Sequence, residues 1–110
     1  MRRKIIAVDF DGTLCVDKYP LIGSPKREVI DHIKKLKIEN NYMLVLWTCR
    51  SGQALKRAVS WCKGQGLTFD YVNENVPSLV KLFTNDCRKV FADIYLDDKA
   101  LNVKEIKYDN

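Results

Sequence analysis

Two carboxylates separated by one residue follow a short apolar run near the start of this 110-residue chain. The run, Ile5 to Val8, is continuously apolar, which predicts a strand buried on both of its faces. Side chains alternate along a strand, so Asp9 and Asp11 are expected to point the same way if the extended form continues. Two such acids repel each other unless a cation lies between them or one keeps a proton. Cation binding or proton transfer would therefore explain the pair.

Gly12 follows these acids and permits a sharp exit from the strand that a side chain would hinder. The same residues have two other interpretations, an acidic turn that caps the strand and a calcium loop. An EF-hand loop needs acids that continue at alternating positions past the glycine and a glutamate at its end. The calcium interpretation is therefore poor, while the acidic turn stays open.

A second pair of acids, Asp97 and Asp98, ends a strand predicted for residues 90–98. Consecutive carboxylates on a turn after a strand can both reach a hard cation, which prefers oxygen ligands. The alternative is that they cap a helix over residues 99–103. Because another acid pair lies upstream, the metal interpretation is favoured.

Thr48 ends a third apolar run, YMLVLW over residues 42–47, which is predicted to be another buried strand. Ser51 is placed to cap a following helix over residues 53–63. A threonine just before a helix N-terminus suits phosphate, because its hydroxyl, backbone N–H groups and the helix dipole can converge. Arg50 could add a phosphate or substrate contact, and a surface position for it is equally open.

The remaining elements follow from periodicity and turn residues. Ser24 and Pro25 are predicted to be the N-cap and the first position of a helix, and apolar residues at helical spacing continue it from residue 26 to about residue 39. Residues 67–72 are predicted to form a strand, and residues 77–86 to contain one or two helical turns. The segment 15–23 is expected to be irregular and too short to make a domain.

Composition predicts one globular domain over residues 1–110, since hydrophobic residues make up 46% and charged residues 30% of the chain. No apolar run approaches the roughly 18 residues of a membrane span, and the chain is expected to be cytoplasmic. The cysteines show neither zinc nor redox spacing, so they are expected to be reduced thiols. The net charge of +5 would attract anions such as phosphorylated metabolites or nucleic acid.

Residues 4–14, KIIAVDFDGTL, resemble the first motif of the haloacid dehalogenase superfamily, DxDGT after a hydrophobic strand. LVLWT, which ends at Thr48, resembles the second motif, and Asp97 with Asp98 resembles the fourth. Cys87-Arg88-Lys89 resembles a pattern of small, capless members, so Lys89 is the expected phosphate-binding cation. The other candidates for that role are Lys81, which comes second, Arg88 and Lys99.

The resemblance, which spans residues 4–99, implies a Rossmann-like three-layer α/β/α sandwich. Its central parallel sheet would have the order 3-2-1-4 for the strands predicted above, without a cap domain. It also implies a magnesium-dependent phosphomonoester hydrolase that works through an aspartyl-phosphate. Mg²⁺ would be held by Asp9, the backbone carbonyl of Asp11, and the Asp97–Asp98 pair.

The resemblance further implies that Asp9 is the nucleophile and Asp11 the general acid and base, while Thr48 and Lys89 hold the phosphoryl oxygens. The expected substrate is a phosphorylated small molecule or a nucleic-acid end. An open, capless site would depend on a partner or a second subunit for closure, so a homo-oligomer is possible. The alternatives are a phosphotransferase of the same superfamily and a catalytically silent nucleic-acid-binding or regulatory module.

Overall fold

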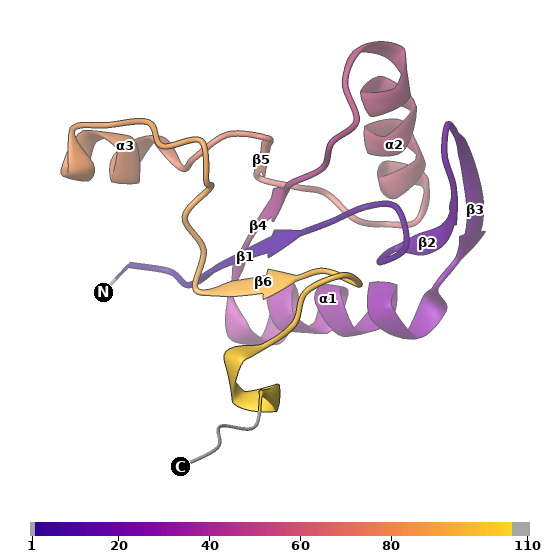
Figure 1. Cartoon of the computed structure of the whole chain (residues 1–110), viewed down its shortest axis with the longest axis horizontal. Helices are drawn as coiled ribbons and strands as arrows, with labels where there is room; N and C mark the ends of the chain where they lie inside the picture. The colour runs from indigo at the N-terminus through magenta and orange to yellow at the C-terminus, as the bar shows by residue number, and fades with distance from the viewer. Residues whose placement is uncertain (1, 107–110) are drawn as a thin grey trace.

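Four short parallel strands form the centre of the protein, which is described here by a computed structural model covering residues 2–106 (Figure 1). The strands are β1 (Ile5–Val8), β4 (Met43–Leu46), β5 (Tyr71–Val72) and β6 (Ile94–Leu96). Their order in the sheet is β5-β4-β1-β6. This confirms the predicted order 3-2-1-4, counted over the strands expected from the sequence.

The register of the sheet brings the ends of three strands to one edge. Val8, the last residue of β1, pairs with Leu46 of β4 on one side and with Leu96 of β6 on the other. The backbone N–H of Asp9 then donates to the carbonyl of Leu96 over 3.0 Å. The residues that follow β1, β4 and β6 therefore emerge side by side.

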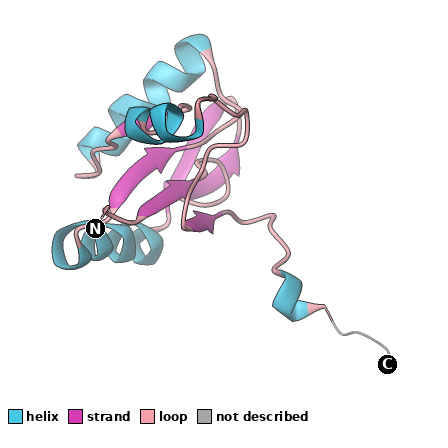
Figure 2. Ribbon diagram, turned by 90° about the vertical axis from the view of Figure 1, so that its left-hand side faces the viewer, coloured by secondary structure: helices cyan, strands magenta, loops and turns pink. Residues whose placement is uncertain are grey.

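Helices cover both faces of this sheet (Figure 2). The helices α1 (Arg27–Asn40) and α2 (Gly52–Gly64) pack on one face, and α3 (Pro77–Phe83) packs on the other. The alternation within β1 divides the core, because Ile6 and Val8 face α1 and α2 while Ile5 and Ala7 face α3. Every residue of β1 is buried, as its continuous apolar run predicts.

A hairpin lies between β1 and α1, where the sequence predicted irregular chain. It consists of β2 (Cys15–Lys18) and β3 (Leu21–Pro25), which pair antiparallel in a separate two-stranded sheet. The prediction of an irregular segment is therefore wrong. Only Cys15 of β2 is buried and no residue of β3 is fully buried, so the hairpin lacks the apolar alternation that marks a half-buried strand.

The hairpin also corrects the predicted start of α1. Pro25 belongs to β3, where it pairs with Cys15, and the N-cap of the helix is Lys26 rather than Ser24. At the other end, Asn41 closes the helix in a left-handed conformation with φ of 57°, which asparagine tolerates better than most residues.

Two predicted strands are shorter in the structure because their first residues bond elsewhere. Before β6, the backbone N–H of Phe91 donates to the side chain of Asn75, and that of Ala92 donates to the hydroxyl of Tyr95. Before β5, the backbone N–H of Leu67 donates to the carbonyl of Cys62 and closes α2. These groups are not available to a neighbouring strand.

Beyond β6 the chain leaves the sheet and ends its described part in a short 3₁₀ helix, η1 (Val103–Glu105) (Figure 2). The four cysteines are free thiols, with Cys15 and Cys62 buried and Cys49 and Cys87 exposed. Among residues 2–106, no helix has both the length and the apolar character needed to cross a membrane.

Candidate metal centre

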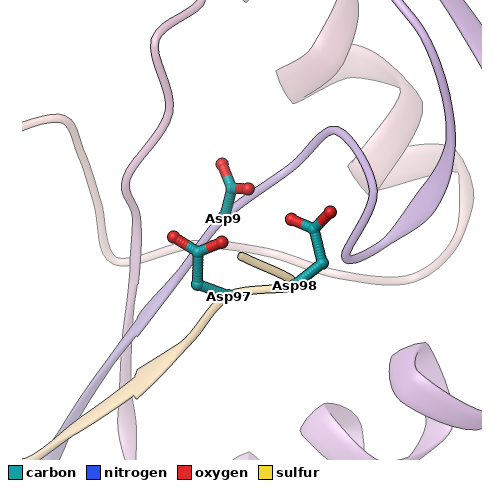
Figure 3. Close-up of side chains that lie close together, drawn as sticks. All are labelled: Asp9, Asp97 and Asp98. Atoms are coloured by element: carbon teal, nitrogen blue, oxygen red, sulfur yellow. The ribbon is translucent and has the colours of Figure 1, made fainter. Parts of the chain in front are cut away.

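Three carboxylates meet where β1 and β6 end. Asp9, Asp97 and Asp98 each offer an oxygen that lies within 4.8 Å of the oxygens offered by the other two. Figure 3 shows the three side chains extending toward a common space from the ends of the two strands. The shared register of Val8 and Leu96 produces this meeting, since Asp9 and Asp97 each follow the last residue of a paired strand.

The environment of Asp9 makes its negative charge costly. Burial raises the pKa of this half-buried carboxyl to about 6, and the negative charges of Asp97, Asp98 and Asp11 add to the rise. A divalent cation would remove this cost, and hard cations prefer such an all-oxygen donor set. The three aspartates could therefore hold a metal ion, as the sequence predicted for these residues.

Thr13 and Lys99 hold Asp98 in place. The hydroxyl of the buried Thr13 accepts a hydrogen bond from the backbone N–H of Asp98 over 3.1 Å, and lies 3.4 Å from its carboxylate as a donor. Lys99 Nζ lies 3.6 Å from the same carboxylate. Burial acts to raise the pKa of Asp98, but Lys99 and local hydrogen bonds leave this pKa below its ordinary value.

The turn after Asp9 is fixed by the backbone and by one lysine. Gly12 has φ of 85°, a left-handed conformation that favours glycine, and its N–H donates to the carbonyl of Cys15 over 2.9 Å. Its own carbonyl accepts from Lys26 Nζ over 2.5 Å. The turn that carries Thr13 toward Asp98 is thereby tied to both the hairpin and α1.

Asp11 is not one of the three clustered acids. Its carboxylate forms a two-pronged ion pair with Arg50, with distances of 2.8 Å to Nε and 2.7 Å to Nη2. The two carboxylates therefore have different surroundings, since Asp9 lies beside Asp97 and Asp98 while Asp11 binds Arg50. The expectation that they point the same way required the strand to continue, but β1 ends at Val8. The backbone carbonyl of Asp11 stays a predicted metal ligand, while its carboxylate is engaged elsewhere.

The surface position considered for Arg50 is wrong, since this residue is only 2% exposed. Its partner was not identified from the sequence. A signal for the pair does exist: β1 and β4 are neighbours, so an arginine just past β4 lies beside an acid just past β1. The predicted strand order contains this signal, but strand order alone does not fix which way the two side chains turn.

Thr48 lies just past β4, the neighbour of β1, where the phosphate prediction requires it. Its backbone N–H donates to the side chain of Asn73 over 2.8 Å, and its hydroxyl accepts from the N–H of Arg50 over 3.2 Å. Asn73 directly follows β5 and has φ of 52°, a left-handed conformation. It is a residue of this edge that sequence reasoning missed.

Lys89, the lysine predicted to bind phosphate, lies beside the ring of Tyr95, and no hydrogen bond or ion pair joins it to the three aspartates among the described residues. Lys89 Nζ lies 5.2 Å from the centre of the Tyr95 ring, in a hollow that Phe91 also lines. Lys99, the last of the four sequence candidates, is the one in contact with Asp98. The assignment of Lys89 stays a prediction, and Lys99 becomes a structural competitor for that role.

The fold and the site define a parallel α/β protein with three clustered aspartates that could bind a metal ion. Among solved structures, the chain is similar to a conserved protein from Bacteroides thetaiotaomicron, with 34% sequence identity and a TM-score of 0.78. The match covers 97% of this chain and 84% of that one. The chain therefore belongs to the same family as this conserved bacterial protein. No family model and no curated protein matches it.

Proposed function

We propose that the protein is a magnesium-dependent phosphomonoester hydrolase of the haloacid dehalogenase type, with a Rossmann-like three-layer fold. The observation that carries the proposal is the meeting of Asp9 with Asp97 and Asp98 at one edge of the sheet. These residues belong to two separate motifs of that superfamily, 88 positions apart in the sequence as counted from Asp9 to Asp97. Thr48, from a third motif, lies beyond the adjacent strand.

The donor set suits Mg²⁺. Asp9, Asp97 and Asp98, with the backbone carbonyl of Asp11, would supply the hard oxygen ligands that this ion prefers. Burial, with the neighbouring carboxylates, raises the pKa of Asp9, and a bound cation would favour its ionised form. When bound, Mg²⁺ would offset the repulsion between the carboxylates and an incoming phosphate.

Asp9 is the proposed nucleophile. Its carboxylate oxygen bonds to the phosphorus as the bond from phosphorus to the leaving oxygen breaks, which gives an aspartyl-phosphate. Asp11 gives a proton to the leaving oxygen and then takes one from the water that attacks the phosphorus of this intermediate. Inorganic phosphate and the free Asp9 carboxylate result.

The proposed binding groups for the phosphoryl oxygens follow β4 in the chain. The hydroxyl of Thr48 and the N-terminal end of α2 lie beyond the strand adjacent to β1. Fixed dipoles of this kind stabilise charge that develops on a transferred phosphoryl group. A lysine completes the set, with Lys89 from the sequence resemblance and Lys99 from its contact with Asp98 as the two candidates.

The substrate class is a phosphorylated small molecule or a nucleic-acid end, which agrees with the net charge of +5. The hairpin is the one insertion between β1 and α1, and its two strands of 4 and 5 residues are too small to enclose a substrate. A site without a cap suits a large phosphomonoester, or closure by a second subunit.

The test is a phosphate-release screen over many phosphomonoesters, with and without Mg²⁺. We expect release that requires Mg²⁺ and that falls by on the order of a thousandfold in Asp9→Asn. Asp31→Asn is the matched control, because Asp31 is an exposed aspartate on α1. Release that is unchanged in Asp9→Asn would defeat the assignment of the nucleophile. Asp9-dependent transfer to an alcohol in place of water would identify a phosphotransferase.

A further inference from the structure

A single buried guanidinium joins Asp11 to the hairpin. Arg50 is 2% exposed, and its Nε and Nη2 bind the two carboxylate oxygens of Asp11. Nη2 also donates to the carbonyl of Leu21 over 3.0 Å, and Nη1 donates to the carbonyl of Pro20 over 3.2 Å. Both carbonyls lie at the turn between β2 and β3.

The remaining contacts of Arg50 use the hydrogen-bond donors of its guanidinium that are still free. Nη1 also lies 3.3 Å from the carbonyl of Ala54 in the first turn of α2. A guanidinium has five N–H donors, and here each nitrogen has at least one partner. A charge can be buried at low cost only when it is paired and fully bonded in this way.

Aromatic rings restrict the same group. The central carbon of the guanidinium lies 5.0 Å from the ring centre of Phe10 and 5.1 Å from that of Tyr19. Phe10 belongs to the core, and Tyr19 belongs to the turn of the hairpin. Arg50 is therefore held by the residue before Asp11 and by the hairpin at once.

We propose that Arg50 is a positioning residue that aims the carboxylate of Asp11 and joins the hairpin to it as one unit. The inference rests on the proposed hydrolysis, in which Asp11 transfers the proton. Within residues 2–106, the side-chain hydrogen bonds to the Asp11 carboxylate all come from Arg50. Without them, fewer contacts would hold this side chain in place, and its carboxyl group would lie within reach of the leaving oxygen less often.

The choice of leaving group separates this role from a structural one. An alkoxide is a poor leaving group and needs a proton as the bond to phosphorus breaks, whereas 4-nitrophenolate leaves without one. If the Asp11 carboxyl group is no longer oriented by Arg50, hydrolysis of an alkyl phosphate should therefore slow far more than hydrolysis of 4-nitrophenyl phosphate. A variant that is only partly folded would lose both activities in equal proportion.

The first experiment compares kcat/KM of Arg50→Gln and Arg50→Lys on these two substrates with Mg²⁺ present. For Arg50→Gln we expect a loss of about a hundredfold on the alkyl phosphate and less than about tenfold on 4-nitrophenyl phosphate. Arg50→Lys keeps the positive charge but cannot form the two-pronged hydrogen bond to Asp11. It should therefore retain part of the activity on the alkyl phosphate that Arg50→Gln loses. In an Asp11→Asn background, Arg50→Gln should add no further loss. Equal losses on the two substrates, or a full additional loss in that background, would overturn the inference.

A second measurement does not depend on activity. Lys18 is exposed in β2, so the rate of trypsin cleavage after Lys18, followed by mass spectrometry, reports opening of the hairpin. Asp11→Asn lies outside the hairpin but weakens the Arg50 link, and we expect severalfold faster cleavage than in the wild type or in Asp31→Asn. An unchanged rate would contradict the link even if Arg50 variants do not fold. Absence of phosphate release by the wild type would instead reject the proposed function.

Discussion

Gly12 lies directly against the carboxylate of Asp98, so close that a Cβ at position 12 would overlap the Asp98 side chain. The contact joins the turn after β1 to the acid pair after β6. Because Gly12 also has φ of 85°, two independent constraints act on this position. The glycine is therefore part of the candidate metal centre, although it has no side chain to offer.

Gly12→Ala is expected to damage both the fold and the acid cluster. A left-handed conformation costs a non-glycine residue roughly 1–3 kcal/mol, and the overlap forces Asp98 away from Asp9 and Asp97. The free energy of unfolding should fall by at least that amount, and stabilisation by Mg²⁺ should be lost. Denaturant unfolding with and without Mg²⁺ measures both effects.

Gly52→Ala is the matched control, since Gly52 has φ of 55° but open space where a Cβ would lie. It should lose stability through backbone strain alone and keep its response to Mg²⁺. If both variants keep that response equally, the contact with Asp98 has no part in metal binding.

Asp97→Asn tests the repulsion among the three acids. Removal of one negative charge should raise the melting temperature of the metal-free protein, because Asp9 and Asp98 then repel fewer neighbours. The same change removes a ligand, so Mg²⁺ at millimolar concentration should stabilise the variant much less than the wild type. We expect the wild type to gain on the order of 1–3 kcal/mol, which raises its melting temperature by roughly 4–15 °C. Thermal unfolding with increasing Mg²⁺ follows both effects.

Asp31→Asn again serves as the control, with no expected change in either measurement. A wild-type melting temperature that does not respond to Mg²⁺, while Asp97→Asn also leaves the metal-free protein unchanged, would mean that the acids neither bind the ion nor repel one another appreciably.

The sequence predicted the sheet because its strands are buried on both faces. The run from Ile5 to Val8 is apolar throughout and is fully buried in the structure. The strand order implied by the family resemblance then predicts that Asp9 lies beside Asp97 at one edge of the sheet. This part of the site depends on the local apolar pattern, which the sequence shows directly, and on the strand order, which the family resemblance implies.

The rest of the site depends on contacts that leave no local pattern. The hairpin is mostly exposed, so its strands have no apolar alternation, and Leu21 remains 72% exposed. The Arg50–Asp11 pair joins residues 39 positions apart through the orientation of two side chains. Lys99 follows Asp98 directly, yet the Cys87-Arg88-Lys89 pattern favoured a lysine that contacts Tyr95 in the structure.

Thr13→Val should separate the two functions of Thr13, packing and hydrogen bonding. Valine has nearly the same shape, but it cannot accept the N–H of Asp98 or donate to its carboxylate. We expect a loss of about 1–2 kcal/mol in unfolding free energy and weaker Mg²⁺ binding, because a hydrogen bond at a site that is 5% exposed is lost. Isothermal titration with Mg²⁺ and denaturant unfolding measure the two effects.

Thr13→Ser keeps the hydroxyl and loses only a methyl group, so it should bind Mg²⁺ nearly as well as the wild type. If the serine variant binds Mg²⁺ as weakly as the valine variant, the packing of the methyl group, and not the hydroxyl, orients Asp98.

An ion pair between Arg2 and Asp93 lies at the start of β1, the end far from the acid cluster. It should make the free energy of unfolding depend on pH. The two side chains form two hydrogen bonds of 2.9 Å, and Asp93 also accepts from the backbone N–H of Ile5 over 2.8 Å. The hydrogen bond from Arg2, helped by the N–H of Ile5, lowers the pKa of Asp93 to about 2. The ordinary pKa of this carboxyl in an unfolded chain is 3.8.

Because the pKa is lower in the folded protein, Asp93 contributes its full stabilisation above about pH 4 and loses it as the pH falls toward 2. Asp93→Asn should therefore reduce the unfolding free energy by about 1 kcal/mol at pH 6, allowing for the partial exposure of the pair. The difference from the wild type should shrink steadily between pH 4 and pH 2, and denaturant unfolding at several pH values measures it. Asp31→Asn should show no such trend, and a difference for Asp93→Asn that stays constant down to pH 2 would mean that the ion pair does not hold the Asp93 carboxylate ionised.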